Sequence, residues 1–475
     1  ITSFLLIAFY RDRYLPVRNA LKVLSFYRLG DICLILAMWM NHHLWHRNIT
    51  FDAWSDKVAL QALLETHSMA FWFVGLAIIL AAAIKSAQFP FSTWLPRAME
   101  GPTTSSSVFY GALSVHIGVF FLLRTYPFWE HEVWMKGLVI AFGVLTSLVA
   151  TGIARVQSTV KTQIAYASVS QIGLMFLEVA LGWHTLALVH FVGNAFLRTY
   201  QLLVSPSVLN YLIHDMFFNF NPGPKLHSNG FYARLKQALY VLNIKEWNLD
   251  AALFRYLWSP FKQMGRVLFF LRGRMGFVIG GVLLLIGVLA IFNKSHLPLA
   301  YLFPATCFFA AMGLLQVLFA LAERDDAQSV WVHAVTSQWF VTVAILLNST
   351  LDALQLVYYL GGSTLASILG YWCLFELKRR EGSLDLHRFH GHVYEHRKLA
   401  MAFLLCCLGV SGFPISPTFI GVDLVFTHVH ADQWLLVGLL AINILFLELS
   451  LLRMYIRLFL GQHQKEYHEI AFRSS

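Results

Sequence analysis

The sequence has 475 residues, of which 58% are hydrophobic and only 13% are charged. A soluble protein carries about 25% charged residues, so this composition excludes a soluble globular protein and indicates a polytopic membrane protein. The net charge of +10 does not indicate nucleic-acid binding, because the cytoplasmic loops of membrane proteins are enriched in Lys and Arg.

Apolar segments long enough to cross a bilayer recur along the chain. A spanning helix needs roughly 20 mostly apolar residues. Stretches of this kind lie near 20–42, 68–89, 104–124, 134–155, 163–182, 184–209, 276–293, 297–321, 328–349, 353–377, 399–428 and 433–461. We therefore expect an all-α polytopic membrane protein with about twelve transmembrane helices. Because Ile1 opens inside an apolar stretch without a preceding Met, we also expect the chain to begin part-way through a longer protein.

Basic residues are concentrated in three of the segments outside these stretches. The segments are 11–18, 210–275 and 378–398. If successive helices cross the bilayer in alternating directions, all three segments lie on the same side. By the positive-inside rule that side is the cytoplasm, so both visible ends of the chain are expected to be cytoplasmic.

The segment 233–272 mixes aromatic with basic residues and is not apolar enough to span a membrane. We predict amphipathic helices on the cytoplasmic surface, an elbow between membrane segments. The elbow either lies among the lipid headgroups or docks a partner protein. In the second case Trp247, Phe254, Trp258 and Phe261 are the expected apolar anchors.

Ionisable residues recur inside the expected spans. Such groups are costly in a bilayer and therefore indicate function. They are Asp31, Lys85, His116, Glu178, His190, Arg198, Asp423 and Glu448. Because they are spread over successive helices rather than gathered in one cavity, they favour a proton relay over the binding site of a large substrate. Burial and neighbouring charges can bring Lys and His into the pKa range that a relay needs.

Lys85 ends its apolar run shortly before Pro90. A proline removes a backbone hydrogen bond and breaks the helix, and the carbonyls freed by a break can face a hydrated cavity. A lysine beside such a break is a candidate proton-loading site. The alternative is a lysine that snorkels to the interface and anchors the helix end.

Several segments carry a resemblance to a known family. They are KSAQFPFSTWLPRAMEGPTTSSSVFYGAL, VQSTVKTQIAYASVSQIGLMFLEVALG, LALVHFVGNAFLRTYQLLVSPSV, RLGDICLILA and GVSGFPISPTFIGVDLVF. Over about 1–208 and 385–461, the sequence resembles the proton-translocating, antiporter-like subunits of respiratory complex I and of Mrp antiporters. The resemblance implies inverted helix repeats, each with a broken helix, and a line of lysines, histidines and acids across the membrane.

The resemblance also implies roles for individual residues. Lys85 matches the family's central lysine, Asp31 the acid on the preceding helix, and Lys161 a lysine at the start of a later helix. Together with the ionisable residues above, the expected proton relay is Lys85, Asp31, Lys161, His190, Arg198, Asp423, Glu178, His116 and Glu448. The prolines expected at the helix breaks are Pro90, Pro96, Pro102, Pro414 and Pro417.

Some positions depart from the family's pattern. Arg198 stands where a lysine is usual, Asn194 and Tyr110 replace histidines, and Asp423 stands where lysine or glutamate is usual. Since arginine stays protonated, we expect Arg198 to act as a fixed charge that tunes His190 rather than as a proton carrier.

The second half of the chain departs further. We expect an antiporter-like bundle over 1–209 that is incomplete at its N-terminus, the elbow over 210–275, an inserted four-helix segment over 276–377, and a second broken helix with a C-terminal helix over 378–475. This remodelling resembles the DabB-type membrane subunits of DAB inorganic carbon transporters.

That resemblance implies a subunit of a bacterial inner membrane that conducts protons or another cation. It also implies a cytoplasmic, carbonic-anhydrase-like (DabA-like) partner, which would hold the zinc and hydrate CO2 in one direction. The alternatives are an ion-translocating subunit of a respiratory or hydrogenase-type complex and an Mrp-type antiporter subunit. We expect no cofactor in this chain and no enzymatic activity of its own.

A histidine-rich stretch, DLHRFHGHVYEHRKL, precedes the second expected break. Its histidines are His387, His390, His392 and His396. The stretch lacks cysteines, and the resemblance implies a linker that binds no metal. We therefore expect a pH-sensitive surface loop in preference to a metal site.

Overall fold

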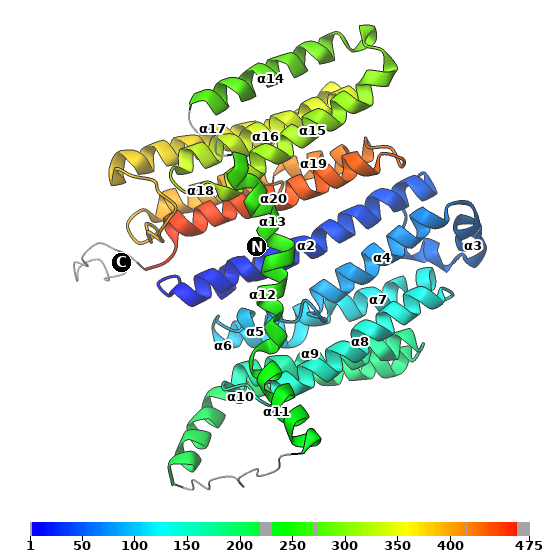
Figure 1. Ribbon diagram of the computed structural model, residues 1–475, viewed down its shortest axis with the longest axis vertical. Helices are drawn as coiled ribbons and strands as arrows, with labels where there is room; N and C mark the ends of the chain where they lie inside the picture. The colour runs from blue at the N-terminus through cyan, green and yellow to red at the C-terminus, as the bar shows by residue number, and fades with distance from the viewer. Residues whose placement is uncertain (1, 219–229, 269–273, 415, 463–475) are drawn as a thin grey trace. The chain divides into compact units, whose positions relative to one another are not determined.

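A computed structural model describes residues 2–218, 230–268, 274–414 and 416–462 of the chain. The contacts divide the chain into two compact units. Unit 1 comprises residues 1–9 and 18–257, and unit 2 comprises residues 10–17 and 258–475. The described residues of both units form helices and connecting loops, with no strand among them (Figure 1). An all-α fold is therefore confirmed for the described part of the chain.

Unit 1 contains most of α2 and the helices that follow it as far as α12. Its long helices are α2 (Tyr14–Trp45), α4 (Ser68–Lys85), α7 (Ile117–Trp129), α8 (Val133–Ala154), α9 (Val160–Ala180), α10 (His184–Phe218) and α11 (Phe231–Ile244). Its shorter ones are α1 (Thr2–Ile7), η1 (Phe51–Ser55), α3 (Lys57–Thr66), α5 (Trp94–Ala98), α6 (Thr103–Ser105), η2 (Ser106–Leu113), η3 (Ser114–His116), η4 (Glu246–Asn248) and α12 (Leu249–Leu253).

Helices α8 and α9 lie side by side and pack closely in unit 1 (Figure 1). Small residues allow the close approach, because a Cβ atom added at Gly143 would lie 2.5 Å from the carbonyl oxygen of Gly173, and one added at Gly173 would lie 2.7 Å from that of Gly143. Inside a bilayer, helices associate through this kind of van der Waals packing between small residues. The pair forms the wall against which the first helix break is held.

Unit 2 contains the remaining helices, and η5 (Phe254–Trp258) lies where the chain passes from one unit to the other. Its elements are α13 (Ser259–Val267), α14 (Arg274–Phe292), η7 (Lys294–His296), α15 (Leu299–Ala322), α16 (Ala327–Asn348), α17 (Ala353–Glu381), α18 (Arg397–Val410), α19 (Pro417–Thr427) and α20 (Trp434–Phe459). Helices α16 and α20 are the most buried of the apolar helices, so they form the core of this unit.

Among the described residues, eight helices are long and apolar enough to cross a membrane, so the expected count of twelve is not confirmed. Expected spans 163–182 and 184–209 coincide with α9 and α10, which are not among the eight. Polar residues such as Lys161, Gln171 and Glu178 on α9 lower its hydropathy. The apolar part of α14, Gly276–Phe292, is short, and the expected span 399–428 is interrupted between α18 and α19.

The elbow is helical where it is described, as α11, η4, α12, η5 and α13, and residues 269–272 lie outside the described part. Two of its expected anchors are already used inside unit 2. The rings of Trp258 and Phe261 lie 6.2 and 4.7 Å from the ring of Phe446 on α20. Both side chains are half-buried, so α20 covers part of their apolar surface, and their role as anchors for a partner stays a prediction.

Candidate functional site

Helix α4 ends at Lys85, and this lysine forms an ion pair with Asp31 on α2. The second carboxylate oxygen of Asp31 accepts a hydrogen bond of 3.1 Å from Nη1 of Arg28. The Lys85 ammonium also lies 4.9 Å from the centre of the Tyr27 ring. The side chains of Lys85 and Asp31 are 16% and 31% exposed, so the pair is largely shielded from solvent. Two cations thus share one carboxylate.

The space for this pair depends on Gly30. A Cβ atom at Gly30 would lie 3.1 Å from Cε of Lys85, so a larger residue would push the lysine away from Asp31. Sequence reasoning identified Lys85 and Asp31 but missed Arg28, Tyr27 and Gly30. For Arg28 the available signal was its spacing from Asp31, since a cation three residues before an acid on a helix lies on the same face.

The chain after Lys85 is not helical until α5 begins at Trp94. The indole nitrogen of Trp94 donates a 2.9 Å hydrogen bond to the carbonyl oxygen of Ile84. The backbone N–H of Phe89 donates to Oγ1 of Thr146 on α8 at 2.9 Å. Backbone groups freed by the break are therefore satisfied by buried side chains, as a membrane interior requires.

The expected break prolines lie in or beside irregular backbone. Pro90 follows Phe89 in the non-helical stretch, Pro96 lies within the short helix α5, and Pro102 directly precedes α6. In unit 2, Pro414 lies between α18 and α19 and Pro417 is the first residue of α19. A π-helical stretch, η2, follows the first break, and such stretches in helices frequently accompany functional sites.

A second polar group joins α9 to α10. Nδ1 of His190 lies 2.8 Å from Oε1 of Glu178, and its Nε2 lies 2.9 Å from Oε1 of Gln171. Both ring nitrogens face oxygen atoms, an arrangement that a doubly protonated imidazolium can satisfy completely. The carboxylate of Glu178 then balances its charge. Gln171 is the member of this group that sequence reasoning missed.

His116, Asn194 and Arg198 form a third group. The amide nitrogen of Asn194 lies 2.9 Å from Nε2 of His116, and its oxygen accepts from Nε of Arg198 at 3.1 Å. The same guanidinium donates to Oε1 of Gln201 at 2.6 Å. If Asn194 donates to His116, Nε2 carries no proton and the imidazole is neutral. Asn194 therefore links the neutral histidine to the permanent charge of Arg198.

The remaining expected relay residues lie elsewhere. Lys161 is at the start of α9, where its ammonium donates to the carbonyl oxygen of Gly101 at 3.4 Å. Asp423 is exposed on α19, and Glu448 is buried on α20, both in unit 2. The groups that unit 1 brings together are thus the ion pair at Lys85, the cluster at His190 and the chain at His116.

An ion-pair network attaches the elbow to the first break. Arg97 of α5 donates to both carboxylate oxygens of Glu246, at 3.3 and 2.7 Å, and to Asp250 at 3.4 Å. Asp250 also pairs with Lys22 of α2. Burial alone would raise the pKa of Asp250, but Lys22, Thr93 and Arg97 together outweigh burial and hold this pKa below its ordinary value. Sequence reasoning missed the network because its members are far apart in the chain.

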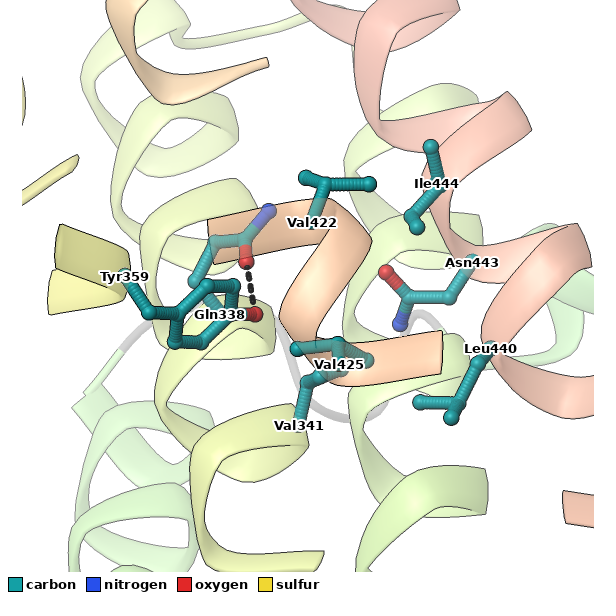
Figure 2. A pocket seen from close by; sticks show the side chains of 8 residues that line it. All are labelled: Gln338, Val341, Tyr359, Val422, Val425, Leu440, Asn443 and Ile444. Carbon is teal, nitrogen blue, oxygen red and sulfur yellow. Dashed lines mark hydrogen bonds between the residues drawn. The ribbon is translucent and has the colours of Figure 1, made fainter. Parts of the chain in front are cut away.

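In unit 2, the polar side chains of Gln338, Tyr359 and Asn443 and five aliphatic side chains line a small cavity (Figure 2). Its volume of about 10 Å³ matches one water molecule. The hydroxyl of Tyr359 donates to Oε1 of Gln338 at 2.7 Å, and Asn443 exchanges hydrogen bonds with Ser337 at 2.9 and 3.2 Å. The other described lining residues are Val341, Val422, Val425, Leu440 and Ile444, so the lining is mostly apolar, with three polar side chains and no charged one.

The described residues form a multi-helix protein with eight helices long and apolar enough to cross a membrane, and charged and polar side chains are buried among these helices. Residues 1–216 match the family described as NADH:quinone oxidoreductase/Mrp antiporter, transmembrane. The sequence is 34% identical to NADH-ubiquinone oxidoreductase chain 5 of Myxine glutinosa over 215 residues, and 34% identical to that of Papio hamadryas over 216 residues, in each case 45% of this chain and 34% of the relative. It is also 34% identical to that of Petromyzon marinus over 219 residues, 46% of this chain and 34% of the relative.

The chain therefore spans about a third of the length of the curated relatives it matches. The antiporter-like resemblance is confirmed for the first 216 residues. Residues 217–475, which include nearly all of unit 2, lie beyond the family match. The special resemblance to DabB-type subunits stays a prediction.

Proposed function

We propose that this chain is an ion-translocating membrane subunit of the complex I/Mrp type and that its ion is the proton. The proposal rests on the carboxylate of Asp31. One of its oxygens pairs with Lys85, and the other accepts a hydrogen bond from Arg28. The family match of residues 1–216 covers all three residues.

The shared carboxylate suggests how Lys85 exchanges a proton. A nearby negative charge favours the ammonium form of lysine. When Asp31 turns wholly to Lys85, the proton is held; when it turns to Arg28, the ammonium loses that stabilisation and can release the proton. Arg28 itself stays charged throughout. The carboxylate is then the switch, and Lys85 is the group that loads and unloads.

Polar groups on η3, α9 and α10 provide the next acceptors in unit 1. His190 can take up or give a proton while Glu178 balances its charge, and His116 begins neutral because Asn194 donates to it. Arg198 keeps a fixed positive charge beside Asn194. In this scheme Lys85, His190 and His116 pass protons. Arg198 passes no proton and acts only through its fixed charge.

Proton flux into liposomes tests the scheme. The full chain is reconstituted with any co-purifying subunits, a pH gradient or potential is applied, and internal pH is followed with a dye. Lys85→Ala should reduce the flux to that of protein-free liposomes. Lys85→Arg should fail as well, because a guanidinium keeps its proton. Lys57→Ala is the matched control, since Lys57 is 65% exposed and pairs with Glu130. Wild-type flux through Lys85→Ala at equal reconstitution would refute the role of Lys85.

The assembly in which the subunit works has two candidates. The relatives named as chain 5 of NADH-ubiquinone oxidoreductase favour a respiratory complex, in which this chain would be a subunit without redox chemistry of its own. The second candidate is an inorganic carbon transporter, in which proton flow drives CO2 hydration by a cytoplasmic, zinc-holding, carbonic-anhydrase-like subunit of the DabA type. Its support is the second half of the chain, residues 217–475, which lies beyond the family match and departs from the usual antiporter-like pattern.

Affinity purification of the tagged chain from its own membranes distinguishes the two. Redox subunits recovered in stoichiometric amounts support the respiratory assembly. A single cytoplasmic subunit that contains zinc, together with uptake of labelled bicarbonate or CO2 that stops in Lys85→Ala, supports the carbon transporter. A set of small membrane subunits without either activity would instead indicate an Mrp-type antiporter.

A further inference from the structure

The loop between α17 and α18 is held rigidly in unit 2. Helix α17 ends at Glu381 and α18 begins at Arg397. On one side, the N–H of Leu386 donates to the carbonyl of Arg324 at 2.6 Å. On the other side, four successive N–H groups, those of residues 390–393, donate to carbonyls of residues 457–460 at 2.9–3.3 Å. Backbone bonds on both sides fix the side chains that the loop presents.

Three of these side chains direct donor atoms at one point. Nε2 of His396 lies 2.7 Å from Oε1 of Glu381 and 3.9 Å from Oε2 of Glu395. One donor atom from each of the three residues lies within 4.8 Å of the others. Nδ1 of His392 lies 3.8 Å from the other oxygen of Glu381. The side chains of Glu381 and His392 are only 6% and 9% exposed, so the point is set into the protein.

We propose that Glu381, Glu395 and His396, with His392 as a fourth ligand, bind a divalent transition-metal ion, with Zn²⁺ the expected one. Zinc binds imidazole nitrogen and carboxylate oxygen at about 2.0–2.2 Å, so donors at tetrahedral corners stand about 3.3–3.6 Å apart. The observed separations of 2.7, 3.8 and 3.9 Å bracket that value. Glu381, Glu395 and His396 therefore need only small side-chain rotations to reach one ion, whereas His392, which approaches the other oxygen of Glu381, has to turn farther.

The donor chemistry fits as well as the spacing. Two carboxylates and two imidazoles combine ligand types that suit first-row divalent metals. Two neutral imidazoles leave the carboxylates with two negative charges, which a divalent cation neutralises. The metal-free alternative is a hydrogen-bonded pair of His396 with Glu381, beside which Glu395 and His392 have separate roles. That alternative predicts no stoichiometric metal uptake.

A bound ion would join the end of α17 to the start of α18. Helix α18 leads directly into the second break, which contains Pro414. The metal would thus fix the entry to this break. The inference concerns only residues of unit 2 and does not depend on the proposed proton relay.

Metal uptake by the purified full chain tests the proposal. The protein is stripped with a chelator in detergent, incubated with Zn²⁺ alone, separated from free metal and analysed by elemental mass spectrometry. We expect about one Zn²⁺ per chain and, in chelator competition, an affinity at least about tenfold lower after Glu381→Gln or His396→Gln. His387→Gln is the matched control from the same loop, because His387 is 57% exposed and pairs with Asp325 instead.

A further variant separates metal binding from folding. His396→Cys supplies a thiolate ligand and should keep Zn²⁺ uptake, whereas His396→Gln should lose it, with both proteins equally monodisperse. Replacement of Zn²⁺ by Co²⁺ should give visible absorption bands that disappear in Glu381→Gln. Uptake no greater than in the buffer blank would overturn the proposal. Equal uptake by wild type and the double variant Glu381→Gln/His396→Gln would also overturn it and assign the metal to adventitious binding.

Discussion

The attachment of the elbow to the first helix break can be tested by removing one charge. Glu246→Gln keeps the shape of the side chain but removes the charge that Arg97 binds with two hydrogen bonds of 3.3 and 2.7 Å. Arg97 would retain its weaker contact with Asp250 at 3.4 Å. We expect α11 and α12 to detach more often from unit 1 in this variant.

The size of the effect follows from the exposure of the pair. Exposed ion pairs contribute roughly 0–1 kcal/mol, and breaking a buried pair costs about 3–5 kcal/mol. The Arg97 and Glu246 side chains are 29% and 12% exposed, which lies between these limits. We therefore expect local opening to become easier by about 1–2 kcal/mol. That change raises the opened population about 5–30-fold.

Hydrogen exchange measured by mass spectrometry in lipid nanodiscs reports this opening directly. Peptides covering residues 231–253 should exchange faster by that factor, while peptides from α8 and α9 should not change. Arg97→Gln should have a similar effect, and the double variant should be no worse than either single one, because the two residues act as a pair. The exchanged pair Arg97→Glu/Glu246→Arg should recover part of the protection.

The control is Glu65→Gln, which removes an exposed carboxylate that pairs only locally with Gln61 on α3. Unchanged exchange of 231–253 in Glu246→Gln would refute the attachment. So would strictly additive effects of Arg97→Gln and Glu246→Gln, since additivity means that the two side chains do not interact.

Two further predictions concern packing and protonation. Gly173→Ala should lower the free energy of unfolding by about 1–3 kcal/mol, because the new Cβ atom would lie 2.7 Å from the Gly143 carbonyl oxygen. The control variant Gly193→Ala, with nothing within 4 Å of the added atom, should be close to neutral. Equal thermal melting of the two variants would contradict the close packing. Burial and four nearby arginines lower the pKa of Lys262 to about 8, so its reactivity with an acylating reagent should rise with a midpoint near that pH. Arg266→Gln removes one repelling charge and should move the midpoint upward, and an unmoved midpoint would exclude that repulsion.

Several features of this protein follow from its sequence because they depend on local chemistry. Low charge and long apolar runs predict a membrane protein whatever its topology. Proline removes a backbone donor wherever it occurs, so the irregular backbone around Pro90 and Pro414 could be located in advance. Lys85 could be singled out because an ionisable group beside such a break is unusual in a membrane segment. The number of spanning helices could not be derived in this way, since polar side chains on α9 obscure its hydropathy.

Other features depend on which helices meet, and hydropathy contains no information on that. Arg28 and Lys85 compete for Asp31 because α4 ends beside Gly30. Gly30 has no side chain and so leaves room for Lys85, which no sequence pattern predicts. The uncharged cavity of unit 2 draws Gln338, Tyr359 and Asn443 from three separate helices. The contact of Trp258 and Phe261 with Phe446 on α20 joins residues far apart in the chain and could not be foreseen either. Apolar and polar surfaces can be recognised in a sequence, but only the tertiary structure decides what covers each of them.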